Sequence, residues 1–252
     1  MERKKIAVVT GASSGLGREF VRLIDQKLKS VDEIWVVARR KDRLEELAKE
    51  GTIPLVSFVW DLEKDDWIEK LEQILEEKQP RVKMLVNCAG FGKIGDCEEV
   101  PVKEAVGMID VNCRALTAMT NLMLPYMAEN SRIIQLASAA AFLPQPRFAV
   151  YAATKSYVLS FSRALNEELK GRGIAVTAVC PGPVRTEFFG IAEETGEVAL
   201  YKKLFLANPV KVVKKAFRDS LRRRSVSVYG GTMNGFYWLC KLLPHSWLLR
   251  FL

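Results

Sequence analysis

The most informative segment of the chain is Ile6-Ala-Val-Val-Thr10-Gly11-Ala-Ser-Ser-Gly15-Leu-Gly17. Its first five residues form a short apolar run, which predicts a buried strand. After the glycine-rich turn, an amphipathic pattern over residues 16–28 predicts a helix. A strand, a glycine turn and a helix together form a cradle for a dinucleotide. The glycines let the backbone approach a pyrophosphate, and the start of the helix presents free N–H groups to it.

The alternation of strands and helices continues along the chain. Further strands are expected at residues 33–38, 53–59, 84–87, 132–137, 175–179 and 225–229. Apolar periodicity predicts helices at 41–49, 66–77, 101–110, 112–128, about 151–171 and 209–222. This order predicts an α/β fold of the doubly wound Rossmann type, with a parallel seven-stranded sheet covered by helices on both faces.

Length and composition limit the class of protein. The chain has 252 residues, which suits one catalytic domain at 1–231 followed by an apolar C-terminal segment at 232–252. The five cysteines lack CxxC spacing and no apolar signal segment follows the first charges, so a cytoplasmic location is expected. The single histidine, His245, argues against a histidine triad or a histidine-rich zinc site, and no metal is expected. The net charge of +8 is dispersed and no nucleic-acid reader motif occurs, so no nucleic-acid partner is expected.

Tyr151-Ala-Ala-Thr-Lys155 places a phenol and an ammonium group on one face of a helix. An ammonium neighbour favours the phenolate, so we expect the pKa of Tyr151 to fall from about 10 toward neutrality. Such a tyrosine can exchange a proton with an alcohol oxygen at physiological pH. The same spacing also occurs where a half-buried tyrosine lies beside a solvated lysine.

The position of other candidate residues favours the catalytic interpretation. Ligands of parallel sheets bind outside the carboxyl ends of the strands. Ser138 and most of the other candidates follow predicted strand ends: Gly11 to Gly17, Arg39, Asp61, Asn87 to Gly90, and Pro181 to Thr186. One edge of the sheet is therefore expected to collect them.

The end of the second strand bears on the choice of cofactor. An acid at this point binds the ribose hydroxyls of NAD, whereas an arginine accommodates the 2′-phosphate of NADP. The chain has Ala38-Arg39-Arg40 there and no acid, which favours NADP(H) over NAD(H). Alternatively, Arg39 and Arg40 only begin the charged helix at 41–49.

Together these motifs resemble the short-chain dehydrogenase/reductase family over roughly residues 6–229. The matching segments are Thr10-Gly-Ala-Ser-Ser-Gly-Leu-Gly17, Asn87-Cys-Ala-Gly90, the tetrad Asn112, Ser138, Tyr151 and Lys155, and Pro181-Gly182 with Val184 and Thr186. Cys88 stands where the family has an asparagine, which removes a polar side chain without abolishing cofactor binding.

The resemblance implies a role for each member of the tetrad. Tyr151 is the general acid of carbonyl reduction, or the base of alcohol oxidation. Lys155 lowers the pKa of Tyr151 and holds the nicotinamide ribose. Ser138 binds the substrate oxygen, and Asn112 positions a water that links Lys155 to solvent. From the residues alone, Ser138 could instead be a turn residue and Asn112 a helix cap.

The resemblance also implies a set of cofactor-binding residues. Arg39 is the favoured ligand of the 2′-phosphate, assisted by Ser14 or Arg40, and Thr186 with the backbone of Val184 holds the carboxamide. Asp61 and Leu62 meet the adenine, and Asn87 lies on the adenosine side. The full set is Gly11, Ser13, Ser14, Gly15, Leu16, Gly17, Arg39, Arg40, Asp61, Leu62, Asn87, Ala89, Gly90, Tyr151, Lys155, Pro181, Gly182, Val184 and Thr186.

Two segments near the C-terminus have less regular patterns. Residues 187–207 have mixed periodicity and are expected to form a mobile substrate lid. Residues 236–252 are very apolar but short for a membrane span. They could cap the pocket or a subunit contact, lie on a membrane surface aided by Arg222, Arg223 and Arg224, or pack on the domain's own core. The first two alternatives suggest a hydrophobic substrate, such as a steroid, a bile acid or a fatty acyl ketone.

The sequence thus predicts an NADP(H)-dependent oxidoreductase that interconverts a ketone and a secondary alcohol. The resemblance also implies a homodimer or homotetramer built on the helix after Asn112 and the helix that carries Tyr151. The alternative is a catalytically silent dinucleotide-binding regulatory or scaffold protein. The presence of all four tetrad residues favours the enzyme.

Overall fold

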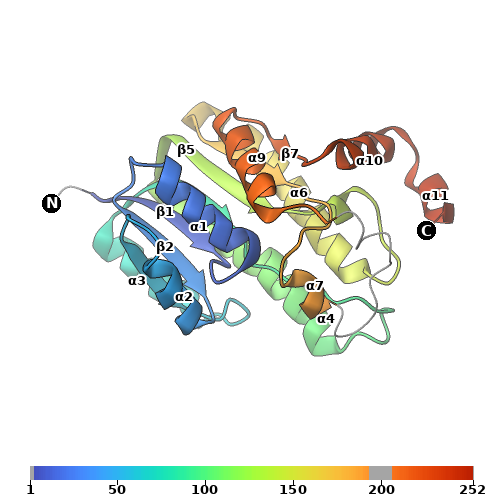
Figure 1. The fold of residues 1–252 in the computed structure, drawn as a ribbon, viewed down its shortest axis with the longest axis horizontal. Coiled ribbons are helices and arrows are strands. Elements are labelled where there is room, and N and C mark those ends of the chain that lie inside the picture. Colours follow the sequence, from blue (N-terminus) through green and yellow to red (C-terminus); the bar gives the residue numbers. More distant parts are fainter. Residues whose placement is uncertain (1–2, 193–205, 252) are drawn as a thin grey trace.

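A computed structural model describes residues 3–192 and 206–251 of the chain. Its centre is one seven-stranded sheet in the order β3-β2-β1-β4-β5-β6-β7 (Figure 1). Every neighbouring pair of strands is parallel. The strands are β1 (Lys5–Thr10), β2 (Glu33–Ala38), β3 (Leu55–Val59), β4 (Arg81–Asn87), β5 (Met127–Leu136), β6 (Ala175–Val179) and β7 (Val226–Ser227).

Helices lie between successive strands and cover both faces of the sheet, and α10 and α11 follow the last strand (Figure 1). They are α1 (Gly15–Lys27), α2 (Lys41–Ala48), α3 (Asp66–Lys78), α4 (Val102–Ile109), α5 (Leu116–Met123), α6 (Ala149–Glu168), α7 (Phe188–Ala192), α9 (Pro209–Leu221), α10 (Gly231–Leu242) and α11 (His245–Leu248). The predicted doubly wound α/β fold is therefore confirmed.

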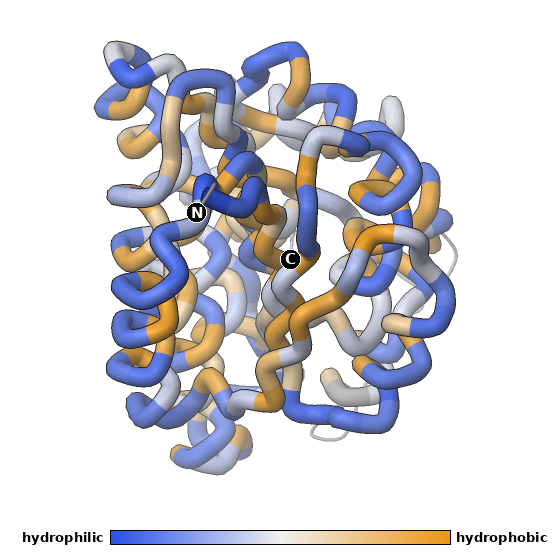
Figure 2. The backbone as a smooth tube through the Cα atoms, turned by 90° about the vertical axis from the view of Figure 1, so that its left-hand side faces the viewer, coloured by the Kyte–Doolittle hydropathy of each residue, from blue (hydrophilic) through white to orange (hydrophobic). Residues whose placement is uncertain are grey.

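The strands bury alternate side chains on opposite faces, as the pleat requires. Ala7 and Val9 of β1 belong to the core under α1, α2 and α9. Ile6 and Val8 belong to the core under α3, α5 and α6. Figure 2 shows the hydrophobic segments gathered toward the interior, while the outer turns of the helices are mainly hydrophilic. Burial on both faces explains why the strands are continuous apolar runs.

Some element boundaries differ from the predicted ones. The expected break between residues 110 and 112 is absent, because a π-helix (Asp110–Ala115) joins α4 to α5 with the backbone helical on both sides. Strand β5 begins at Met127, five residues earlier than predicted. Strand β7 has only two residues, since it pairs with β6 only at Ala178 and Val179.

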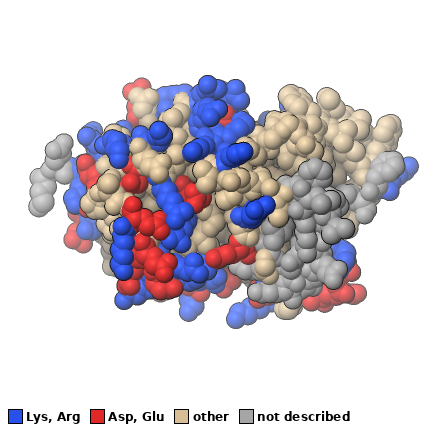
Figure 3. All heavy atoms as spheres, viewed as in Figure 1, with Lys and Arg blue, Asp and Glu red and all other residues tan. Residues whose placement is uncertain are grey.

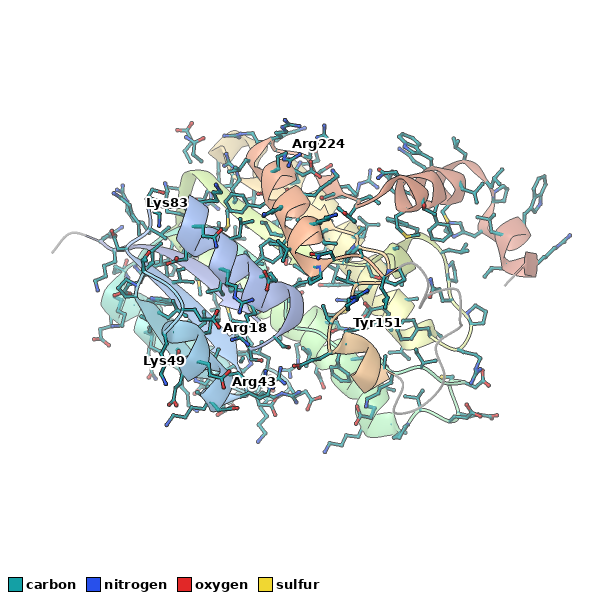
Figure 4. The ribbon with its side chains drawn as sticks, viewed as in Figure 1. Arg18, Arg43, Lys49, Lys83, Tyr151 and Arg224 are labelled. Carbon is teal, nitrogen blue, oxygen red and sulfur yellow. The ribbon has the colours of Figure 1, made fainter. Side chains whose placement is uncertain are left out.

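The carboxyl ends of the strands form the edge where the site lies. The glycine turn leaves this edge between β1 and α1, and Ser138 follows β5 there. Figure 4 shows Tyr151 at this edge, close to α7. The fold therefore brings together residues that are far apart in the chain.

Candidate active site

A cavity of about 420 Å³ opens at the carboxyl ends of the strands. Almost all of the predicted site residues line it. They are Gly11, Ser13, Ser14, Gly15, Leu16, Gly17, Arg39, Arg40, Asp61, Leu62, Ala89, Gly90, Ser138, Tyr151, Lys155, Pro181, Gly182, Val184 and Thr186. Asn87 and Asn112 are the two predicted site residues that do not line the cavity.

The glycine turn forms a cradle that a side chain would fill. Gly11 has φ +67, and a β-carbon there would lie 2.7 Å from the backbone nitrogen of Ala89. A β-carbon at Gly17 would lie 2.2 Å from the carbonyl oxygen of Gly11. Helix α1 has no acidic residue in its first turn, and Ser14 at its N-cap does not bond the helix backbone. Free N–H groups at a helix start with no competing acid fit a pyrophosphate.

A carboxylate of the protein already lies beside this cradle. Arg40 Nη1 lies 2.8 Å from Glu187 Oε2, and Arg40 Nη2 lies 3.2 Å from Ser13 Oγ. The Glu187 carboxylate also bonds the side chain of Ser14. The bond from Arg40 is the largest influence that lowers the pKa of Glu187. These arginine and serine groups thus bind one anion and are suited to hold another, such as a phosphate.

Arg39 is exposed, and in the described part of the chain it forms no hydrogen bond or ion pair. It lines the same cavity as Arg40. The two arginines therefore differ: Arg40 forms an ion pair with Glu187, whereas the Arg39 side chain is available to a ligand.

Tyr151 lies in the first turns of α6 with its side chain in an aromatic cluster. Its ring stacks on Phe148 at 4.3 Å between centroids and lies 5.4 Å from Phe188. Burial raises the pKa of Tyr151 to about 12, and the nearby side chain of Ser138 lowers it in part. The prediction of a pKa near neutrality is wrong for this structure, because burial penalises the phenolate.

Lys155 is buried and points past Tyr151. Its Nζ donates to the carbonyl oxygen of Leu136 at 2.8 Å and lies 5.6 Å from the centre of the Tyr151 ring. Burial lowers the pKa of Lys155 to about 8. Since the ammonium bonds a carbonyl rather than the phenol, it does not offset the burial of Tyr151. Tyr151 and Lys155 do lie close together, as predicted, but Lys155 does not lower the pKa of Tyr151 to near neutrality.

Asn112 lies in the π-helix, fully buried behind the cavity wall. Its Nδ2 donates to the carbonyl of Phe91 and to Thr154 Oγ1, and its Oδ1 accepts from the backbone N–H of Phe91. A β-carbon at Gly90 would lie 2.7 Å from Asn112 Oδ1 and 3.2 Å from Lys155 Nζ. Asn112 therefore adjoins Lys155 through the space that Gly90 leaves open. Thr154, which the sequence analysis missed, joins Asn112 to the carbonyl of Tyr151.

The structure does not bring Asn87 to the cavity. Its Nδ2 donates to Thr120 Oγ1 at 3.0 Å and to Gln135 Oε1 at 2.9 Å, and the side chain is 2% exposed. The pleat is the physical reason, because the side chain at the last position of β4 faces α5. The side chain of Asn87 thus connects β4, β5 and α5 inside the protein.

Several residues that line the cavity were not predicted. They are mostly apolar: Phe91, Ala140, Phe148 and Phe188 pack in one cluster with Tyr151, and Val111 and Gln145 line the same cavity. Phe148 was the easiest to foresee, since it lies three residues before Tyr151 and therefore on the same face of a helical turn. The others come from loops or short helical segments that lie far from Tyr151 in the chain or on no shared helical face with it.

The predicted lid is only partly described. Its first residues form α7, and Val184 pairs with Ala207 so that the segment begins and ends at one place. Residues 193–205 lie outside the described residues. Residues 206–251 contribute no side chain to the described cavity wall, although Met233 of α10 packs directly behind Gly182. The alternative in which the C-terminal segment caps the cavity therefore has no support in the described residues.

The sequence matches a family model described as short chain dehydrogenase over residues 5–196. The chain belongs to the short-chain dehydrogenase/reductase family. It is therefore an oxidoreductase of CH–OH groups, and the predicted resemblance is confirmed. Among curated short-chain dehydrogenases/reductases, sulfoacetaldehyde reductase 2 of Chromohalobacter salexigens is 32% identical over 209 residues, which cover 78% of this chain and 81% of that relative.

Solved short-chain dehydrogenase/reductase structures share the whole fold. One from Sphingobium yanoikuyae, in complex with NADPH, is 26% identical with a TM-score of 0.78 and covers 96% of both chains. The 3-ketoacyl-(acyl-carrier-protein) reductase of Brucella melitensis, complexed with NADH, is 26% identical with a TM-score of 0.75 and covers 92% of this chain and 98% of that one. Both nicotinamide cofactors thus occur in similar members of the family.

Proposed function

We propose that this enzyme is an NADP(H)-dependent oxidoreductase that interconverts a ketone and a secondary alcohol on a hydrophobic substrate. The proposal is supported by the position of Tyr151, Ser138 and Lys155 together on the wall of one cavity, with the Lys155 ammonium bonded to the carbonyl of Leu136. This arrangement places a proton donor, an oxyanion donor and a cation around one position.

The bound nicotinamide would supply or accept the hydride. Tyr151 would then give its proton to the carbonyl oxygen, while Ser138 donates a hydrogen bond to the same oxygen. Because the pKa of Tyr151 is about 12, the phenol is protonated across neutral pH and acts as an acid. The free enzyme therefore holds the protonated phenol that carbonyl reduction requires. Lys155, as an ammonium, would stabilise the phenolate that remains.

The preference for NADP(H) rests on the cationic side of the cradle. Arg40 already binds the Glu187 carboxylate and also donates to Ser13, and Ser14 and Arg39 line the same cavity. A 2′-phosphate carries more charge than a carboxylate and offers three acceptor oxygens to these donors. The absence of an acid at residues 38–40 removes the usual partner of the NAD ribose.

The hydrophobic substrate is inferred from the wall around Tyr151. Phe91, Phe148 and Phe188 lie there with Ala140 and Val111, and Gln145 adds one amide. A pocket of this kind excludes water and binds apolar surface, while a few polar groups orient the ligand. Steroid, bile acid and fatty acyl ketones have this character.

The direct test mixes the purified protein with NADPH and a panel of ketones that differ in size and polarity, and follows NADPH absorbance at 340 nm. We expect oxidation of NADPH with bulky apolar ketones and slower turnover with NADH. The negative control is Tyr151→Phe, which keeps the aromatic ring in its cluster but lacks the hydroxyl that donates the proton. Tight NADPH binding without turnover of any ketone would support the rival, a silent dinucleotide-binding protein.

Assembly and location stay predictions. We propose a cytoplasmic homodimer or homotetramer that uses α5 and α6. On these helices Tyr157, 42% exposed, bonds Thr117 and stacks on Phe161, which offers an aromatic surface to a second copy. All five cysteines are free thiols, as a reducing compartment would keep them. Light scattering after gel filtration gives the mass in solution.

A further inference from the structure

Helix α10 is apolar on two opposite faces. Its inner face carries Met233, Phe236, Tyr237 and Cys240, which pack on the domain beside Phe142. The Tyr237 ring lies 5.0 Å from the Phe142 ring. A surface helix normally presents polar residues on its other side. Here the outer side is apolar as well.

The outer side of α10 continues into α11 as one exposed surface, which we name the tail patch. Its residues are Trp238, Leu239, Leu242, Leu243, Trp247 and Leu249, between 37% and 74% exposed. Leu242 has the largest exposed fraction, and Trp247 follows at 59%. These six residues fall within twelve consecutive positions, and the next largest group of exposed large apolar side chains in the described chain is Val102, Val106 and Ile109 on α4. Contiguous apolar surface of this kind marks an interaction site.

The charged residues within residues 220–252 all have one sign, although Arg224 also lies 3.6 Å from the Asp219 carboxylate of α9. Residues 220–252 contain no aspartate or glutamate, although the chain has 30 acidic residues. They do contain Arg222, Arg223, Arg224, Lys241 and Arg250. Figure 3 shows the end of the molecule that carries α10 and α11 as mostly uncharged, with basic atoms beside it and at its tip. Figure 4 places Arg224 on the same upper edge as α10.

One contact within the patch is typical of a membrane interface. Lys241 Nζ lies 4.9 Å from the centre of the Trp238 ring. A tryptophan beside a lysine can bury its ring among acyl chains while the ammonium reaches the headgroups. No helix in the described part of the chain combines the length and the apolar composition that crossing a bilayer requires. The segment is therefore suited to lie on a membrane rather than to cross it.

We infer that the tail patch docks this enzyme on an anionic lipid surface. A second copy of the chain is a poorer occupant, because a two-fold contact through this patch would bring the same cations together without an acid to offset them. An anionic bilayer satisfies both the apolar side chains and the cations. The inference does not depend on the proposed cofactor or substrate.

Docking would hold the active site close to the lipid. Helix α10 follows the carboxyl end of β7, the edge of the sheet at which the cavity opens. Met233 of α10 packs directly against Gly182, which lines the cavity. An apolar ketone dissolved in the bilayer would then have a short path to Tyr151.

The test is sedimentation of the full-length protein with vesicles of phosphatidylcholine alone or with 30% phosphatidylglycerol, which is a conventional anionic fraction. The variant Leu242→Ser/Trp247→Ser removes apolar surface without changing the net charge, and both positions are exposed enough for the fold to tolerate them. Val102→Ser, 78% exposed on α4, is the matched control. A second readout is quenching of tryptophan fluorescence by lipids brominated on the acyl chains.

We expect the wild type and Val102→Ser to bind the anionic vesicles and to be quenched. Pure phosphatidylcholine should bind at least about tenfold less protein, since several cations contribute to the attraction. Leu242→Ser/Trp247→Ser should lose binding about tenfold or more and lose the quenching. Equal binding by the double variant would show attraction by net charge alone and would overturn the inference. So would a wild type that binds no vesicle but forms a dimer that the double variant breaks.

Discussion

Arg40 Nη1 and Glu187 Oε2 lie 2.8 Å apart, although the two residues are 147 positions apart in the chain. The pair places a carboxylate against the groups that are suited to a 2′-phosphate. Glu187→Gln should therefore strengthen NADPH binding by up to about fivefold, because an exposed ion pair contributes about 1 kcal/mol or less. Titration of intrinsic fluorescence with NADPH gives the Kd. NADH is the internal control, and an equal gain for both cofactors would contradict the competition.

Arg39 and Arg40, which follow β2, should favour NADPH over NADH, whereas the nearby cation Lys41 should not. Arg39→Ala and Arg40→Ala should each weaken NADPH roughly 10- to 100-fold, the value of one or two charge-assisted hydrogen bonds. NADH should be affected much less. Lys41→Ala, which removes an exposed charge outside the cavity, is the matched control. The NADP assignment fails if either arginine variant weakens NADH and NADPH equally.

Replacement of the Tyr151 hydroxyl should separate catalysis from binding. Tyr151→Phe keeps the stacking on Phe148 but removes the proton donor. Turnover should fall by about 10²- to 10⁴-fold, as for the loss of a general acid, while NADPH still binds. Tyr157→Phe on the same helix removes a hydroxyl that bonds Thr117 and should leave turnover unchanged. Lys155→Ala should damage both turnover and cofactor binding.

The pH dependence of reduction should report Lys155. Burial lowers its pKa to about 8, so the free enzyme holds the ammonium below that pH and loses it above. Tyr151, with a pKa of about 12, stays protonated over this range. The value of kcat/KM for ketone reduction should therefore fall about tenfold per pH unit above pH 8. Lys155→Arg stays charged over this range, so its kcat/KM should not decline above pH 8, although its turnover should be slower than that of the wild type. A flat wild-type profile up to pH 9 would exclude Lys155 as the controlling group.

Asn87 should affect stability rather than cofactor binding. Its amide donates to Thr120 and Gln135 inside the protein. Asn87→Ala should lower the free energy of unfolding by about 1–3 kcal/mol, since it leaves buried partners unsatisfied. Urea denaturation gives that free energy, and the Kd for NADPH should not change. If the variant were as stable as the wild type but bound NADPH with a higher Kd, Asn87 would belong to the cofactor site.

Much of the fold could be predicted because local patterns reflect it. Strands β1 and β2 are apolar runs because nearly every residue in them is buried. Helix α1 is periodic because only one of its faces is buried. The length of β7 could not be predicted in this way, since it depends on how many residues of β6 pair with it, and only Ala178 and Val179 do. The same holds for the continuity of α4 with α5, which depends on a π-helix that leaves no mark in the apolar pattern.

The site residues were predictable for a related reason. Parallel strands end at one edge, so residues after strand ends meet there whatever the details of packing. The orientation of each side chain was not predictable. Asn87 turns toward α5 and Asn112 lies behind Gly90, because the pleat and the helix face decide where a side chain points. Glu187 was missed because only the fold brings α7 to Arg40.

The order of strands and helices, the glycine cradle, the tetrad and the family can all be read from the chain, because these features are local motifs or follow from parallel topology. The protonation of Tyr151, the partner of Arg40 and the two-sided exposure of α10 become visible in the folded protein alone. Burial and charge contact depend on neighbours from distant parts of the chain. Burial of the phenol outweighs its helical spacing to Lys155, a result that no spacing in the sequence records.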